Sequence, residues 1–232
     1  MNRTLSASPS LAEAALSHLR SDNPILVRGA VAAASRVLFF DNDRLFSSAA
    51  RSKAENALLA ASEHVVRVGD GQTIINFISA LGGIQNERSH RILWEFARQH
   101  VAYGQALIAI TWHKNVNDLP RLAAILDAPV TGDPLSPELS SLPYALRNAY
   151  GAAALPILED VLKKSGYVWV RTNCARELIL ENRPSGFAFV ADAIEQDRRY
   201  KREMIALVLE RFPELRGADE AAVLAFLKQR AI

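Results

Sequence analysis

The sequence predicts an all-α fold, a right-handed α-α superhelix (α-solenoid) of about six stacked helical hairpins. Three observations predict it: apolar residues recur at helical spacing, short turn-forming clusters separate them, and the second half of the chain repeats itself. The helical spacing is clear in Leu155, Leu158, Val161 and Leu162, and strand-like alternation is nearly absent. Because the helices are short and the connections tight, we expect consecutive helices to lie antiparallel.

The periodicity predicts the elements in order. We expect helices at 10–20, 25–39, 52–66, 71–82, 87–100, 102–113, 118–127, 141–150, 152–164, 167–181, 185–196, 199–212 and 218–230. Turn-forming residues separate them, for example Asp, Asn and Pro at 22–24, Asp70 with Gly71, and Gly82 with Gly83. The stretch 43–49 is a candidate for one further turn.

An internal repeat decides how these helices are arranged. The segments VNDLPRLAAILDA, AAALPILEDVLKK and PSGFAFVADAIEQ align Leu126, Leu162 and Ile194, and ADEAAVLAFLKQR places Leu227 one position earlier. These four residues are separated by 36, 32 and 33 residues. A unit of two helices cannot bury both of its apolar stripes alone, so neighbouring units must stack and share a core. We therefore expect a single solenoid domain over 1–232.

Three segments resemble a known repeat family. Residues 10–38 resemble a HEAT repeat: an apolar helix, a turn of Asp, Asn and Pro, and then Val27 and Arg28 at the start of an Ala-rich helix. Residues 152–181 repeat the scheme with Val170 and Arg171, and residues 80–97 are similar to the junction between HEAT-like repeats of the class named after phycobilisome lyases. The resemblance implies that Arg28 and Arg171 are structural, each bonded to an acidic turn residue of an adjacent unit. Cys174 is expected to pack between closely spaced helices.

Two places interrupt the repeat. The insertion 129–141 holds three prolines and one glycine, which exclude a continuous helix, and it is a binding loop or, as we favour, a spacer. The junction 40–52 holds the run Asp41, Asn42 and Asp43. This run begins like a calcium loop, but the required glycine and distal glutamate are missing, so a helix cap is favoured.

Composition restricts the classes of function. Lys and Arg number 27 and Asp and Glu 25, a net charge of +2 that is too even for a general nucleic-acid binder. A single cysteine supports neither an internal disulfide nor a structural zinc site. No apolar run is long enough for a membrane span and no signal peptide is evident, so we expect a cytoplasmic protein without a membrane partner.

No catalytic motif is present. The five histidines form no HExxH, and nucleophile elbow, phosphate-loop and dinucleotide patterns are absent. The neighbouring carboxylates at 159–160 and 219–220 point to different helix faces and are expected to be solvated or to cap helices. We expect no metal, no cofactor and no catalytic residue.

The favoured hypothesis is a non-catalytic protein-binding or scaffolding module that uses the concave surface of the solenoid. Another protein is the expected partner, rather than nucleic acid or a small molecule. Aromatic and arginine side chains dominate interface energetics, and the candidate contacts are Trp112, Tyr144, Arg147, Tyr150, Arg176, Arg198, Arg199, Lys201 and Arg202. The cluster at 198–202 is either a solvated turn or a docking site for an acidic surface or phosphate.

Two alternatives stay open. The resemblance to lyase-associated repeats implies a bilin lyase or chaperone-like subunit, with a tetrapyrrole or phycobiliprotein as partner. The similarity of Trp112 and Asp118 to the tryptophans and aspartate of HEAT-like DNA glycosylases implies an enzyme acting on alkylated bases, although the spacing departs from that motif. Either alternative would make the chain more than a scaffold.

Overall fold

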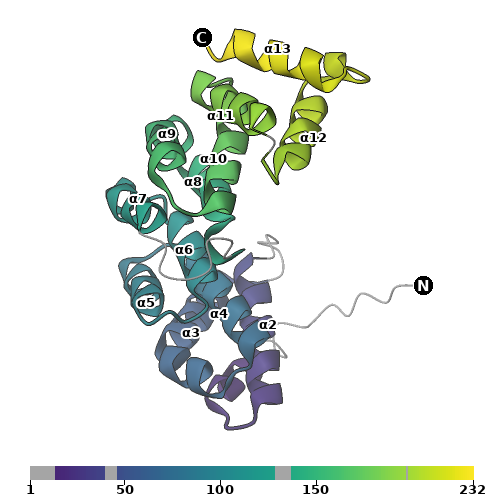
Figure 1. The fold of residues 1–232 in the computed structure, drawn as a ribbon. Coiled ribbons are helices and arrows are strands. Elements are labelled where there is room, and N and C mark those ends of the chain that lie inside the picture. Colours follow the sequence, from purple (N-terminus) through teal and green to yellow (C-terminus); the bar gives the residue numbers. More distant parts are fainter. Residues whose placement is uncertain (1–13, 40–45, 129–136, 197) are drawn as a thin grey trace, which may run out of the picture. The chain divides into compact units, whose positions relative to one another are not determined.

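The computed structural model describes residues 14–39, 46–128, 137–196 and 198–232. Over these residues the protein is helical, with twelve α-helices, five short 3-10 helices and no β-strand. The all-α prediction is therefore confirmed (Figure 1). The runs of the chain outside these ranges include most of the insertion 129–141 and the run at 41–43, so the predictions made there lie outside the described residues.

The α-helices of the first half are α2 (Pro24–Phe39), α3 (Ser48–Val68), α4 (Gly71–Gly83), α5 (Glu87–Arg98) and α6 (Tyr103–Thr111). Those of the second half are α7 (Leu119–Asp127), α8 (Leu142–Tyr150), α9 (Leu155–Lys164), α10 (Val168–Leu180), α11 (Pro184–Glu195), α12 (Lys201–Arg211) and α13 (Glu220–Arg230). The 3-10 helices are η1 (Ser17–Arg20), η2 (Val116–Asp118), η3 (Pro137–Leu139), η4 (Gly151–Ala154) and η5 (Pro213–Leu215).

Two kinds of residue set where the helices begin. Ser47, Asp70, Asn86 and Asp219 are N-caps whose side chains accept a hydrogen bond from the backbone N–H three residues later. Proline occupies the first helical turn of α7, α8, α9 and α11, where its missing N–H is no loss. Asp219 is thus a cap, as expected for the carboxylates at 219–220.

The chain divides into two compact units, one ending at Lys114 and the other beginning at Asn115. In the first unit α4 packs against both α2 and α6, while α3 and α5 pack against the helices that flank them in sequence (Figure 1). Large side chains such as Phe77, Ile78 and Leu107 are fully buried between these helices. Whether the two units form the single predicted domain stays a prediction.

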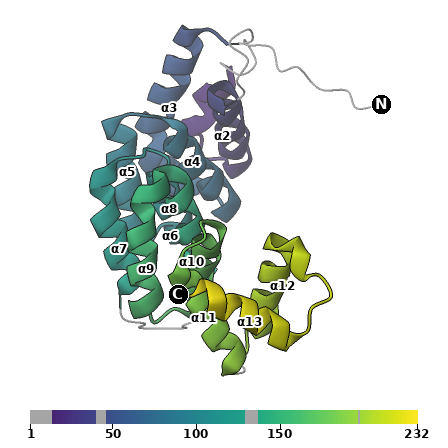
Figure 2. The ribbon, with the colours of Figure 1, turned by 90° about the horizontal axis from the view of Figure 1, so that it is seen from above.

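In the second unit α10 packs against α9 and α11 and also contacts α8 and α12, and α11 packs against α13 (Figure 2). The residues that mark the repeat in the sequence lie in the core of this unit. Leu126, Leu162, Ile194 and Leu227 come from α7, α9, α11 and α13, and all four side chains are buried. Their burial agrees with the predicted repeat, and the stacking of the repeats stays a prediction.

Several predicted boundaries need correction. The described end of the helix expected at 10–20 is the 3-10 helix η1, and α3 begins at Ser48 instead of residue 52 because Ser47 provides the cap. The helix expected at 152–164 begins with η4 and continues as α9 from Leu155. The left-handed backbone at Gly151, with φ of 54°, ends α8.

The two arginines after the turns behave differently. Arg28 forms an ion pair with Asp70, the acidic cap in the next turn, which confirms the bond expected for it. Arg171 donates from Nε to the Leu162 carbonyl at 2.9 Å, and its guanidinium lies 5.0 Å from the ring centre of Phe189. Its contacts are thus structural, but they are not the expected acidic contact.

Candidate functional site

Most of the predicted contact residues lie on α8, α10 and α12 of the second unit. Tyr144, Arg147 and Tyr150 belong to α8, Arg176 to α10, and the cluster 198–202 to α12 and the turn before it. Both α8 and α12 contact α10, so these candidates lie on three neighbouring helices. Trp112 belongs to the first unit.

On α8, Tyr144 and Arg147 differ in what they offer to a partner. Tyr144 is 56% exposed, so its ring is accessible. Arg147 forms ion pairs with Glu177 and, at 3.2 Å, with Glu181, both from α10. The hydrogen bond to Glu177 raises the pKa of Arg147. Arg147 therefore joins α8 to α10 and has little of its side chain left for a partner.

Tyr150, at the end of α8, is also held within the unit. Its hydroxyl donates to the carbonyl oxygen of Asn115 at 3.3 Å. Burial, together with the charge of Asp118, raises the pKa of Tyr150 to about 12. The phenol is half-buried and tied to the start of the unit, so its main contact is internal.

Only part of the basic cluster at 198–202 is available. Lys201 forms an ion pair with Glu220 of α13 at 3.3 Å, and Arg198 donates to Gln196. Arg199 and Arg202 are exposed and form no ion pair within the described part of the chain. One of the four charges is therefore neutralised, and the guanidiniums of Arg198, Arg199 and Arg202 keep theirs.

A shallow pocket of about 190 Å³ lies between α10 and α12. Five side chains line it: Arg176, Leu180, Leu207, Glu210 and Arg211. The sequence pointed only to Arg176 among them. The i, i+4 spacings from 176 to 180 and from 207 to 211 place each pair on one helix face, but the sequence does not show that these faces meet.

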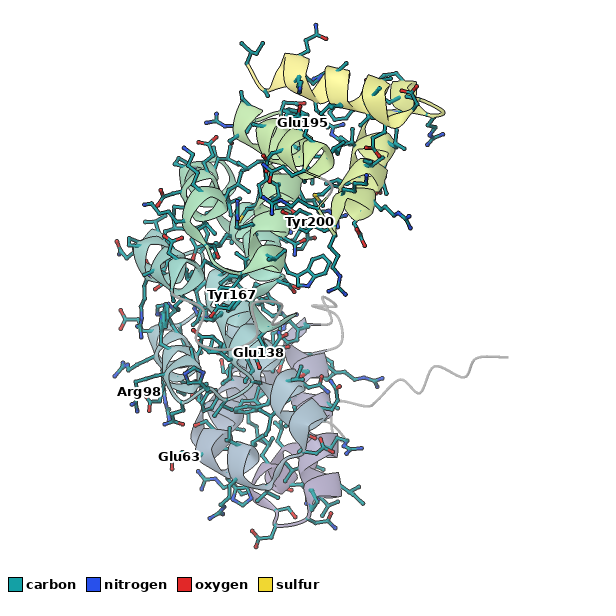
Figure 3. The ribbon with its side chains drawn as sticks, viewed as in Figure 1. Glu63, Arg98, Glu138, Tyr167, Glu195 and Tyr200 are labelled. Atoms are coloured by element: carbon teal, nitrogen blue, oxygen red, sulfur yellow. The ribbon has the colours of Figure 1, made fainter. Side chains whose placement is uncertain are left out.

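An aromatic stack marks the other end of the same two helices. The rings of Phe189 on α11 and Tyr200 are 6.0 Å apart and nearly parallel, at 7°, and Arg171 lies over Phe189. Tyr200 directly precedes α12 (Figure 3). Arg171, near the start of α10, and Tyr200, just before α12, both lie beside Phe189. Later residues of both helices line the pocket. The two helices therefore run in the same direction.

Trp112 follows α6 in the first unit and is 37% exposed. A Cβ at Gly82 would come within 2.7 Å of its ring, and one at Gly83 would collide with the half-exposed ring of Phe39. The two glycines thus lie under two aromatic rings, a role beyond ending α4. The carbonyl oxygen of Trp112 also accepts a hydrogen bond from Gln85 at 3.3 Å.

The remaining reactive side chains form no recognisable centre. Three or more metal-ligating side chains do not come together anywhere in the described ranges. His90 and His113, which are far apart in sequence, have ring centres 5.0 Å apart, a pairing that sequence spacing did not predict. Cys174 is fully buried, as expected, and burial raises the pKa of its thiol.

None of the described helices is both long and apolar enough to cross a membrane. Comparison with known protein families, curated proteins and solved structures finds no match. The chemistry of the chain's own residues is therefore the basis for its proposed function.

Proposed function

We propose that the protein is a HEAT-like α-solenoid of about six helical hairpins that binds another protein without catalysing a reaction. Two features support the solenoid. Buried residues of the sequence repeat recur in α7, α9, α11 and α13, and α10 contacts both α8 and α12. Repeats that contact only their neighbours leave an extended surface, which suits recognition of a partner chain.

The observation that supports the binding function is the mixture of side chains on the neighbouring helices α8, α10 and α12. Tyr144 is largely exposed, Arg176 and Arg202 are exposed, and a pocket with leucine side chains opens between α10 and α12. Tyrosine and arginine next to apolar surface are the types that dominate protein interfaces.

Affinity capture from the native host, followed by mass spectrometry, tests this proposal. The bait is the full chain, compared with a variant that carries Tyr144→Ala, Arg199→Glu and Arg202→Glu. The matched control reverses two exposed arginines of α5 in the first unit, Arg88→Glu and Arg91→Glu. We expect the specific partners to be lost with the first variant and kept with the control.

The same set of proteins on all three baits would contradict the proposal. The bilin and glycosylase alternatives have their own tests: a change in absorbance on adding a bilin, and release of a methylated base that is lost in Trp112→Ala. No contact described above favours either of them.

A further inference from the structure

The pocket between α10 and α12 combines an apolar floor with charged walls. Leu207 is buried and Leu180 is half-buried, so the floor is aliphatic. Arg176 comes from α10 and Arg211 from α12, which places a guanidinium group on each wall. Each guanidinium can bind a carboxylate through two parallel N–H donors.

Within the described residues, these charged groups form no ion pair. Arg176 and Glu210 are exposed and form no ion pair in the described part of the chain, and Arg211 lies 5.6 Å from the ring centre of Phe212. Two guanidiniums and one carboxylate leave the pocket with a charge of about +1.

The size and charge of the pocket select among ligands. A volume of about 190 Å³ is smaller than the roughly 300 to 1,000 Å³ of pockets that enclose a cofactor or drug-sized molecule. The pocket lies at the carboxyl ends of α10 and α12, where the helix dipoles disfavour anions, and Glu210 adds a negative charge. The helix dipoles and Glu210 repel the two negative charges of a phosphate dianion more strongly than the single negative charge of a carboxylate.

We propose that this pocket binds an acidic and aliphatic segment of a partner protein. One carboxylate of the segment binds Arg176 and Arg211, and a neighbouring aliphatic side chain covers Leu180 and Leu207. This inference rests on the proposed protein-binding function and names the chemistry of the partner.

The test uses the full chain and fluorescence polarisation of labelled peptides. The probe is a peptide of alternating glutamate and leucine, compared with one of glutamine and leucine and one of glutamate and serine. We expect the first peptide to bind at least about fivefold more tightly than either of the others, and its affinity to fall as salt is added.

Variants of the pocket make the test specific. Arg176→Gln and Arg211→Gln should each weaken binding of the glutamate–leucine peptide by about fivefold, whereas Glu210→Gln should strengthen it, because it removes a like charge. Arg88→Gln with Arg91→Gln, in the first unit, is the matched control and should change nothing. Equal thermal unfolding midpoints show that each variant is folded, so a general loss of structure cannot mimic opposite effects at 176 and 210.

Four results would each overturn the inference. Two concern the peptides: equal binding of the glutamine–leucine peptide, or no binding of the glutamate–leucine probe. The other two are unchanged affinity in Arg176→Gln and tighter binding of an oligonucleotide of the same charge. The capture experiment above distinguishes this failure from failure of the proposed function. If its partners still depend on Tyr144 and Arg202 while the peptide does not bind, only the chemistry of the pocket is wrong.

Discussion

Glu177 is a carboxylate with only 2% of its side chain exposed, and Arg147 from the neighbouring helix neutralises it. Removing one partner of such a pair leaves a buried charge uncompensated. We expect Arg147→Met to lower the free energy of unfolding by about 3 kcal/mol, measured by urea denaturation. The sequence pattern predicted Arg147 as a partner contact. A loss of this size would show that its main role is to stabilise the packing of α8 against α10.

Two further variants are controls for this prediction. The double change Arg147→Met with Glu177→Met should recover most of the loss, because neither charge is then left alone. Tyr144→Ala, on the exposed face of α8, should change stability by no more than about 0.5 kcal/mol. A loss in the double variant equal to that of Arg147→Met would contradict the ion-pair explanation.

Replacing either of two helical glycines with alanine should change the stability, in opposite directions. A Cβ at Gly186 of α11 would lie 2.9 Å from the Cβ of Leu178 and 3.0 Å from backbone atoms of α10, which cannot move easily. A Cβ at Gly29 of α2 would meet nothing within 4 Å. We expect Gly186→Ala to destabilise the protein by about 1 to 3 kcal/mol and Gly29→Ala to stabilise it by about 0.4 to 1 kcal/mol.

Thermal unfolding of both variants beside the wild type checks this prediction. A stable Gly186→Ala variant would mean that α11 and α10 do not approach as closely as described. Gly29→Ala tests the opposite expectation, since its gain comes from the reduced entropy of the unfolded chain.

At the scale of the helix, Asp127 ends α7 with its carboxylate in an unfavourable place. Burial, with the charge of Asp160 as a second cause, raises the pKa of Asp127 above its ordinary value of 3.8. The negative end of the α7 dipole also disfavours the charge. A raised pKa means that the protonated carboxyl favours the folded state, and that this contribution is lost as the pH rises through the folded pKa.

We therefore expect Asp127→Asn to stabilise the protein by about 0.3 to 1 kcal/mol at pH 7. The gain should shrink as the pH falls and vanish below about pH 3.8, where the wild-type carboxyl is protonated in both states. Unfolding midpoints of both proteins from pH 3 to pH 7 measure this difference. A gain that does not depend on pH would contradict the electrostatic cause.

The helices were largely predictable because their signals are local. Apolar spacing, turn clusters, proline and capping residues such as Asp219 all act within a few residues of the position they determine. The early start of α3 was missed because Ser47 caps it in a stretch without apolar periodicity. The 3-10 helix η4 was also missed, because apolar spacing over 152–164 does not distinguish a 3-10 turn from the α-helix that follows it.

The candidate site was less predictable because it depends on contacts between distant residues. Exposed Tyr144 and Arg176 can be proposed from their helix positions, but Arg147 looks equally available until Glu177 is placed beside it. Leu207 and Arg211 drew no attention, because only the packing of α12 against α10 turns them toward Arg176. The pair of His90 and His113 depends in the same way on how α5 meets the end of α6.

For the whole molecule, the central question is how far each unit depends on the other. The second unit buries its own set of large apolar side chains, among them Leu146, Leu158 and Phe187. The ion pairs of Arg147 with Glu177 and of Arg183 with Glu159, the latter at 2.8 Å, also join helices inside this unit. In a repeat protein, stability is approximately the sum of terms within repeats and between neighbours, so a run of repeats can fold without the rest.

We therefore expect residues 115–232, produced alone, to form a folded helical unit with cooperative thermal unfolding. It should be less stable than the full chain, because the proposed solenoid would then have fewer repeats. Circular dichroism and hydrogen exchange measure this, with slow exchange expected for the backbone amides of α9, α10 and α11. Arg147→Met should destabilise the fragment as much as it destabilises the full chain, since both partners of the pair lie within 115–232. A fragment that exchanges all its amides rapidly would show that its core requires residues before 115, and would contradict the sum of local terms that a solenoid implies.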